Sequence, residues 1–108
     1  MTLANPTHQL DAIVYPTSPR PATLVNPPTP LGGGGADSPT SFANQTGFPD
    51  LIVPAGMTTE GLPVTISFFG LAFTEAKLLG FGYDFEQATH AIKLPKHTPL
   101  LASDALAQ

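Results

Sequence analysis

The sequence has no cysteine, which excludes a disulfide framework, a thiolate nucleophile and a cysteine-based zinc site. It is also poor in charge, since charged residues are 11% of the chain against about 25% in an average soluble domain. Only four residues are basic and the net charge is −4, whereas phosphate binding needs clustered Lys or Arg, so no nucleic-acid partner is expected. No apolar run reaches the roughly 18 residues of a membrane span, and no signal peptide is visible. No membrane partner is expected, and the cytoplasm is the default compartment.

The motifs of several common chemistries are absent as well. There is no Gly-x-Ser-x-Gly elbow, and the serines stand in no recognisable order with a histidine and an acid. The three histidines form no i,i+4 pair, so no metal site is expected. No cofactor is expected either. Glycines 32–35 are followed by Ala-Asp-Ser-Pro rather than by Lys-Ser, which predicts a flexible loop and not a phosphate site. We expect turn or surface positions for the serines Ser18, Ser38, Ser41, Ser67 and Ser103.

The apolar content is high for a chain with so little charge. Leu, Ile, Val and Phe make up 28 of the 108 residues, about 26%, above the level of about 20% below which disorder is the default. A small domain has a high surface-to-volume ratio and should need more charge than usual, not less. This composition therefore suits a piece of a larger interior, and we interpret residues 1–108 as a single partial domain.

Residues 44–70 contain the clearest structural pattern, two strands joined by a turn. Residues 51–54 form an apolar run that Pro54 closes, and residues 64–69 form a second run that begins after Pro63. In the second run, side-chain alternation places Val64, Ile66 and Phe68 on one face and Thr65, Ser67 and Phe69 on the other. The connection contains Gly56 and Gly61, which tolerate positive φ.

The flanking segments complete an α/β pattern of about three strands and one main helix. Residues 12–15 are a short β-prone run, and residues 16–39 are a loop rich in proline and glycine. Residues 74–89 predict a helix, with Thr74 as its N-cap and Gly80 and Gly82 allowing a close approach to the sheet. Residues 100–108 are expected to be a flexible tail. The helical spacing predicts that the following residues face the sheet: Leu78, Phe81 or Gly82, Phe85 and Ala88.

A group of short motifs makes the central stretch specific. The pieces are Asn44, Thr46-Gly47-Phe48-Pro49, Val53-Pro54-Ala55-Gly56, Gly61-Leu62-Pro63-Val64, and Phe73 with Glu75. Upstream, residues 10–19 end in Pro-Thr-x-Pro. Together they resemble the C-terminal part of the amidase signature family, hydrolases and amidotransferases that cleave carboxamide C–N bonds. The resemblance implies an incomplete edge portion of that family's mixed β-sheet, and structural roles for Asn44, Gly47, Pro49, Pro54, Gly56, Gly61 and Pro63.

The resemblance also indicates what this chain does not carry. Members of the family use a Ser–Ser–Lys triad whose serines lie in a Gly-Ser-Ser-Gly-Gly-Ser-like stretch, and this sequence has no Ser-Ser or Gly-Ser pair. We therefore expect no catalytic residue here and no activity of the chain alone. The expected partner is an N-terminal amidase segment, and an amide substrate is expected only in the complete enzyme. The alternative is a stand-alone, non-catalytic interaction module derived from the same fold.

Asp37 is the one residue with a sharper role implied by the resemblance. In glutamine-handling members of the family, an acid several residues ahead of the Asn-x-x-Gly-x-Pro string holds the amino group of the substrate. Asp37 lies seven residues before Asn44, in a similar position. A carboxylate at that place makes physical sense if the substrate carries an ammonium group. The alternative is a turn-forming Asp ahead of Ser-Pro.

With so few elements, the isolated chain is expected to leave apolar surface uncovered. Phe68, Phe69, Phe81 and Phe85 are expected to face neighbours that are not part of this chain, beside an open strand edge. We therefore expect the chain alone to self-associate or aggregate.

The first testable prediction concerns Asp37. When this chain is expressed together with a segment that carries the Ser-Ser-Gly-Gly and lysine elements, Asp37→Ala should weaken the use of amides that bear a free ammonium. Neutral carboxamides and anilides should be hydrolysed nearly as before, because they offer no charge to pair with. The measurement is kcat/KM on a matched pair of charged and neutral amides, and equal losses on both would remove Asp37 from the site.

Overall fold

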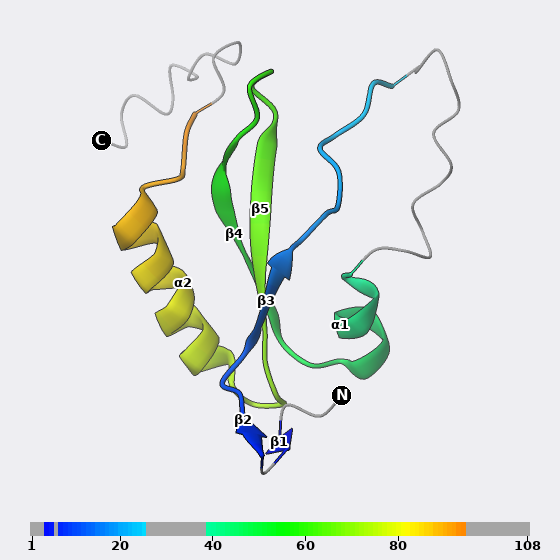
Figure 1. Ribbon diagram of the computed structural model, residues 1–108, viewed down its shortest axis with the longest axis vertical. Coiled ribbons are helices and arrows are strands. Elements are labelled where there is room, and N and C mark those ends of the chain that lie inside the picture. The colour runs from blue at the N-terminus through cyan, green and yellow to red at the C-terminus, as the bar shows by residue number, and fades with distance from the viewer. Residues whose placement is uncertain (1–3, 6, 26–38, 95–108) are drawn as a thin grey trace, which may run out of the picture.

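The computed structural model describes residues 4–5, 7–25 and 39–94 (Figure 1). A short antiparallel pair, β1 (Ala4–Asn5) and β2 (His8–Gln9), lies at the N-terminal end. The main sheet consists of β3 (Ile13–Pro16), β4 (Asp50–Met57) and β5 (Pro63–Phe69). Two helices accompany it, α1 (Ser41–Thr46) and α2 (Glu75–Thr89). The predicted α/β arrangement of three strands and one main helix is confirmed. Asp37, residues 26–38 of the predicted loop and the tail at 100–108 lie outside the described residues.

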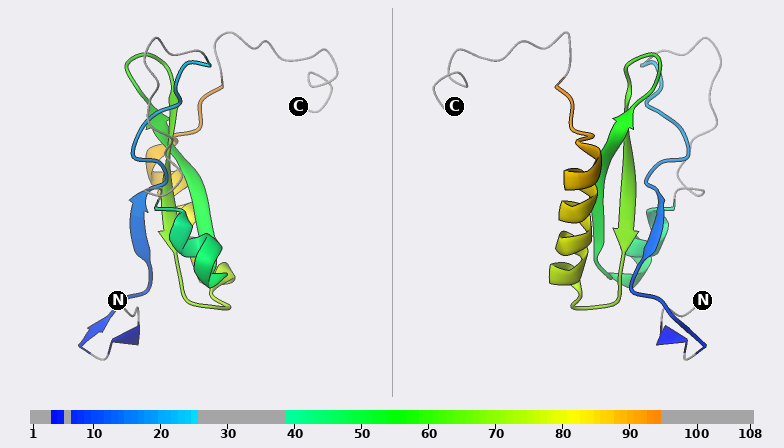
Figure 2. Two further views of the ribbon diagram at one scale, coloured as in Figure 1. Left: turned by 90° about the vertical axis from the view of Figure 1, so that its right-hand side faces the viewer. Right: turned by 60° about the vertical axis from the view of Figure 1, so that its left-hand side comes forward.

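The main sheet has the order β3-β5-β4, with both neighbouring pairs antiparallel. Pairing of β5 with β4 confirms that a short connection joins adjacent strands. The last three residues of β5, Ser67, Phe68 and Phe69, are buried, which fits its place between the two other strands. On the side of the sheet opposite α2 lies α1, as Figure 2 shows.

The strand β4 is longer than the apolar run predicts. Pro54 does not end it but pairs with Thr65 inside the ladder, and the strand continues to Met57 through a bulge between Pro54 and Gly56. Proline is tolerated there because, in the described sheet, β4 is an edge strand and needs no hydrogen bond on its outer side. Gly56 has φ +135°, which suits the bulge.

The turn between β4 and β5 depends on Gly61. This residue has φ +85° and donates its N–H to the Thr58 carbonyl at 3.0 Å. Thr58 closes the turn further, because its N–H reaches the Leu62 carbonyl at 2.8 Å and its hydroxyl accepts the Leu62 N–H at 3.1 Å. Pro63 is the first residue of β5, where a missing N–H costs little.

The helix α2 packs on β4 and β5 through Leu78 and Gly82. Leu78 is 1% exposed and Gly82 is buried. A Cβ built on Gly82 would lie 2.6 Å from Leu51 Cδ2 and 3.2 Å from Val53 Cγ1, so the helix approaches β4 more closely than any other residue would allow. The predicted close approach is confirmed for Gly82 and wrong for Gly80, whose surroundings within 4 Å are open.

The aromatic residues of β5 find partners within the chain itself. Phe68 packs under α2, with ring centroids 6.5 Å from Phe81 and 6.0 Å from Phe85. Phe69 points to the other face and stacks on Phe48 at 6.3 Å, which confirms the predicted alternation. Phe68 and Phe69 are each only 8% exposed, so the expectation that they face absent neighbours is wrong. The expectation that Ala88 faces the sheet is wrong, because this residue is exposed.

The helix α1 has no counterpart in the sequence prediction. It ends at Gly47, which has φ +68° and donates its N–H to the Ala43 carbonyl at 2.9 Å. Thr46 stabilises the same end, since its hydroxyl donates to the Phe42 carbonyl at 2.7 Å and accepts the Phe48 N–H at 3.2 Å. The signal available in the sequence was Gly47, a residue type that commonly ends helices, directly after residues 41–46.

The two helical glycines provide a matched test of the packing. Gly80→Ala should stabilise the chain by about 1 kcal/mol, because alanine favours the helix and nothing obstructs its Cβ. Gly82→Ala should be less stable than Gly80→Ala by about 1 kcal/mol or more, since Leu51 must move to admit the new methyl group. Urea unfolding followed by circular dichroism measures both. Equal stabilisation by the two substitutions would contradict the close contact at Gly82.

Candidate functional site

The residues singled out in the sequence fall at several separate places. Asn44 is exposed on α1, and Gly47 follows at its C-terminal end. Pro49 links α1 to β4, and its carbonyl accepts the Gly70 N–H at 3.0 Å. Pro54 and Gly56 lie within β4, whereas Gly61 and Pro63 lie at the other end of the hairpin. The structure therefore brings Asn44, Gly47 and Pro49 to one end of the sheet and does not gather all seven residues around one point.

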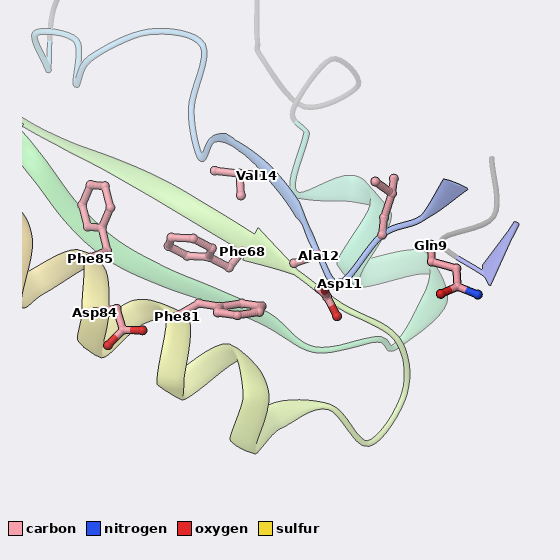
Figure 3. A pocket seen from close by; sticks show the side chains of 9 residues that line it. Gln9, Asp11, Ala12, Val14, Phe68, Phe81, Asp84 and Phe85 are labelled. Carbon is pink, nitrogen blue, oxygen red and sulfur yellow. The ribbon is translucent and has the colours of Figure 1, made fainter. Parts of the chain in front are cut away.

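An open groove of about 620 Å³ lies beside α2 (Figure 3). Aromatic rings from β5 and α2 line it, and two carboxylates stand in its wall. The lining residues are Gln9, Leu10, Asp11, Ala12, Val14, Phe68, Phe81, Asp84 and Phe85. Because α2 packs mainly on β4, it leaves the β3 side of the sheet uncovered, and the groove occupies that space.

The groove offers an apolar surface and little chemistry. Asp11 is already paired with Lys77, whose Nζ lies 2.9 Å from its Oδ1. The side chains of both are at least half exposed, so solvent screens this ion pair and it contributes little stability. Among its lining residues there is no Ser, Thr, Lys, His or Tyr to act as a nucleophile or as an amine or imidazole base. The groove is therefore suited to contact with apolar surface.

A polar cluster occupies the opposite face of the sheet, with one residue from each strand. The Tyr15 hydroxyl of β3 donates to Asp50 Oδ2 of β4 at 2.5 Å. The Ser67 hydroxyl of β5 lies 2.9 Å from that of Thr17 and is completely buried. The expectation that Ser67 lies in a turn or on the surface is wrong, because β5 is the central strand and its alternation turns Ser67 into this cluster.

Burial raises the pKa of Tyr15 to about 12, and the hydrogen bond and the negative charge of Asp50 act in the same direction. A hydrogen bond with Ser67 has the opposite effect on this pKa. The second oxygen of Asp50, Oδ1, is buried and has no hydrogen-bond partner within the described residues. The cluster was not predicted, because its members are far apart in the sequence and only the strand register brings them together.

The cluster does not form a catalytic constellation. A serine nucleophile needs a base within hydrogen-bond reach, and Ser67 is hydrogen-bonded to other hydroxyl groups. Across residues 4–5, 7–25 and 39–94, no group of three His, Asp or Glu side chains could hold a metal ion. The two described lysines, Lys77 and Lys93, are at the surface. Among the described residues, neither lysine therefore lies buried where it could act as a base.

Within the same described ranges, no helix is both long enough and apolar enough to cross a membrane.

Comparison with known proteins settles the family. The sequence matches the Amidase family over residues 2–79, which is more than half of the chain. This chain belongs to the amidase family. The match covers β1 to β5, α1 and the first residues of α2.

The relatives of this amidase-family chain include A-type subunits of an amidotransferase. It is 38% identical over 94 residues to the A-type subunit of the glutamyl-tRNA(Gln) amidotransferase of Desulforudis audaxviator, a match that covers 84% of this chain. It is 38% identical over 91 residues to the corresponding protein of Oceanobacillus iheyensis, covering 82% of this chain. The chloroplastic/mitochondrial counterpart of Vitis vinifera is 35% identical over 102 residues, covering 90%. No solved structure matches the chain significantly.

This chain corresponds to only a small part of the length of each of these relatives. The matched regions span 19% of the Desulforudis and Oceanobacillus proteins and 18% of the Vitis protein. Each matched region thus makes up most of this chain but less than a fifth of the length of the relative.

The polar cluster of this amidase-family chain generates a pH prediction. The folded pKa of Tyr15 lies above its usual 10.0, so the fold favours the protonated phenol. Its contribution to stability should be complete below pH 10.0 and lost as the pH rises towards about 12. Tyr15→Phe should lose less stability than the wild-type chain as the pH rises from 10.0 towards about 12. Thermal melts across this pH range measure the difference.

The same cluster allows a second variant as a control. Asp50→Asn leaves the burial that mainly raises the pKa of Tyr15 and removes the negative charge that adds to it, while keeping the size of the side chain. The tyrosinate absorbance assigned to Tyr15, by difference from Tyr15→Phe, should then appear at lower pH. An unchanged titration would show that the negative charge of Asp50 does not contribute to the raised pKa of Tyr15.

Proposed function

We propose that this chain is the C-terminal segment of an amidase-type hydrolase acting on carboxamide C–N bonds. The observation that carries the proposal is the family match over residues 2–79, taken with a span of only 19% of its amidotransferase relatives. The motifs between Asn44 and Glu75 resemble the C-terminal part of the amidase signature domain. In this proposal the chain provides part of the sheet, and the catalytic residues come from the remainder of the domain.

The architecture supports the role of a sheet segment. In the described sheet, β3 and β4 are hydrogen-bonded only to β5, so each has a free outer edge. Free edges readily accept another strand. The groove beside α2 leaves Val14 half exposed and the rings of Phe81 and Phe85 partly open. Together, the two edges and the groove offer the surfaces that further elements of an amidase domain would cover.

The chemistry supports inactivity of the chain alone. Amide hydrolysis needs a nucleophile, a base that activates it and donors for the oxyanion. The sequence has no Ser-Ser or Gly-Ser pair, and Ser67 is fully buried with no base beside it. Lysine acts as a base when burial lowers its pKa, but Lys77 is half exposed and paired with Asp11. The chain therefore acts by completing a fold and closing one side of the substrate cleft.

Asp37 has a place in this proposal as a contact for the substrate. It lies outside the described residues, and its role rests on the resemblance and on its position seven residues before Asn44. The described α1 begins four residues after Asp37, at the end of the sheet where Asn44, Gly47 and Pro49 lie. In this proposal the carboxylate of Asp37 holds the ammonium group of a glutamine-like substrate.

The test is complementation. The probe is the part of the Desulforudis audaxviator protein outside the 94 matched residues, expressed with this chain and separately. Neither segment alone should hydrolyse glutamine or simple carboxamides above background, and the pair should. The control is the 94-residue segment of the Desulforudis protein itself, which must restore activity to the same probe.

Each outcome separates the proposal from its alternatives. Hydrolysis by the 108-residue chain alone would contradict the assignment of the catalytic residues to another segment. Binding of the two segments without any gain in hydrolysis would favour the non-catalytic interaction module. With the control active, failure of this chain to bind the probe would overturn the proposal.

A further inference from the structure

The turn between β5 and α2 contains a phenylalanine in an unusual conformation. Phe73 has φ +63°, in the left-handed region that bulky residues rarely adopt. Phe73 is 95% exposed, the largest exposed fraction of any phenylalanine in the described part of the chain. A strained backbone persists where the surrounding structure fixes it, and such residues gather at ligand clamps and functional sites. The conformation of Phe73 therefore needs an explanation that its own contacts do not supply.

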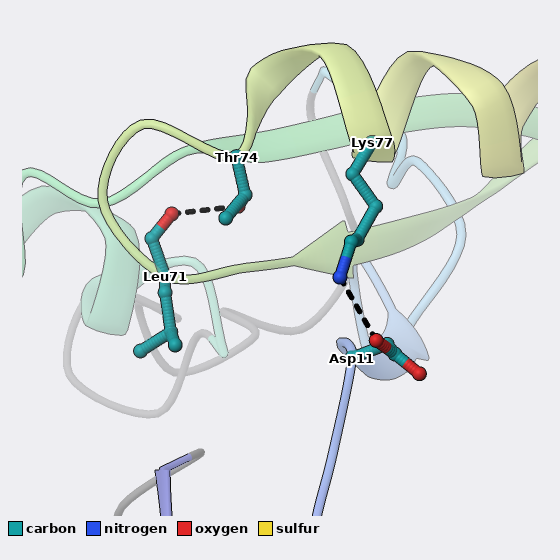
Figure 4. Close-up of polar contacts among 4 residues, drawn as sticks. All are labelled: Asp11, Leu71, Thr74 and Lys77. Atoms are coloured by element: carbon teal, nitrogen blue, oxygen red, sulfur yellow. Dashed lines mark hydrogen bonds and ion pairs between the residues drawn. The ribbon is translucent and has the colours of Figure 1, made fainter.

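The surrounding turn is fixed by hydrogen bonds on both sides of Phe73. The Thr74 hydroxyl and the Thr74 N–H donate to the Leu71 carbonyl, at 2.6 and 3.3 Å (Figure 4). The Leu78 N–H donates to the Thr74 carbonyl at 3.0 Å and so joins the turn to α2. A Cβ on Gly70 would lie 2.5 Å from Thr74 Oγ1, so this turn leaves no room for another residue there. These hydrogen bonds fix the turn in which Phe73 is exposed to solvent.

The placement of Phe73 contrasts with that of the other rings of this region. Phe68, Phe81 and Phe85 pack against one another between β5 and α2. Phe69 stacks on Phe48. The Phe73 ring, by contrast, gains nothing from burial within the described chain, although hydrophobic burial is the main favourable term for such a side chain. Aromatic residues, phenylalanine among them, are enriched in the buried core of protein interfaces.

We propose that Phe73 is a docking anchor that inserts into an apolar pocket on the remaining part of the amidase domain. This inference rests on the proposed function. The occupant follows from coverage, because Phe73 lies inside the family match at residues 2–79 while the matched region spans 19% of the Desulforudis relative. The phenyl ring of Phe73 is apolar, so a pocket that buries it favourably is apolar as well.

A second copy of this chain is a poorer occupant for the Phe73 ring. The apolar groove that it would have to offer carries Asp11 and Asp84 in its wall. Each copy carries a net charge of −4, which disfavours seating the Phe73 ring beside these two carboxylates of another copy.

The experiment measures the affinity of this chain for the Desulforudis probe defined above. Phe73→Ala should weaken binding about 30-fold, the loss of a strong interface anchor, since each tenfold corresponds to about 1.4 kcal/mol. Phe73→Gly should weaken binding equally and raise the melting temperature of the isolated chain, because glycine adopts positive φ without strain. The matched control is Phe42→Ala, which removes a ring that is 64% exposed on α1 and should leave the affinity within about threefold.

The outcomes distinguish the anchor from the proposed function. If the wild-type chain binds the probe and Phe73→Ala binds it as tightly, Phe73 is not a docking anchor and the proposed function stands. If the wild-type chain does not bind while the native Desulforudis segment does, both are overturned. If Phe73→Ala instead converts a dimer of this chain into monomers and leaves probe binding unchanged, the occupant is a second copy and the inference is overturned.

Discussion

The close contact between Gly82 of α2 and the side chains of Leu51 and Val53 determines how the helix lies on the sheet. Because a Cβ at that position would meet Leu51 at 2.6 Å, the helix axis can approach β4 only with glycine there. That approach seats Leu78 against the sheet and places Phe81 and Phe85 beside Phe68, the interior ring of the central strand. It also displaces α2 towards β4, which leaves the groove open on the β3 side.

The resulting core is small for the amount of chain that it must order. Among the described residues the buried apolar side chains are Phe68, Phe69, Leu78 and Ala91, whereas twelve large apolar or aromatic side chains are exposed. Fixing each residue costs about 1–2 kcal/mol of backbone entropy, which so few buried groups offset poorly. Only 11% of the residues are charged, whereas a small domain with a high surface-to-volume ratio should need more charge than usual. These features are the physical basis of our proposal that this amidase-family chain works as part of a larger domain.

Much of the fold followed from local sequence pattern, and the remainder depended on long-range pairing. The β5 alternation, the helix from Glu75 to Thr89 and the close approach at Gly82 were predictable, because each has its signal within a few neighbouring residues. The extension of β4 through Pro54 was not, since only its position at the edge of the described sheet makes proline harmless. The cluster of Tyr15, Asp50 and Ser67 was missed because strand register alone unites residues that far apart. The sequence shows Phe73 only as part of a motif. Its positive φ was not predictable, because it depends on how the chain turns between β5 and α2.

Hydrogen–deuterium exchange of the chain, alone and with the Desulforudis probe, tests the central claim that this is an incomplete sheet. In the isolated chain the amides of β5 should exchange most slowly, since it is paired on both sides, and the outer-edge amides of β3 and β4 should exchange fast. Addition of the probe should slow exchange along at least one of those outer edges and around the turn at Phe73. An isolated chain that melts cooperatively as a monomer, with edge exchange unchanged by the probe, would contradict the account.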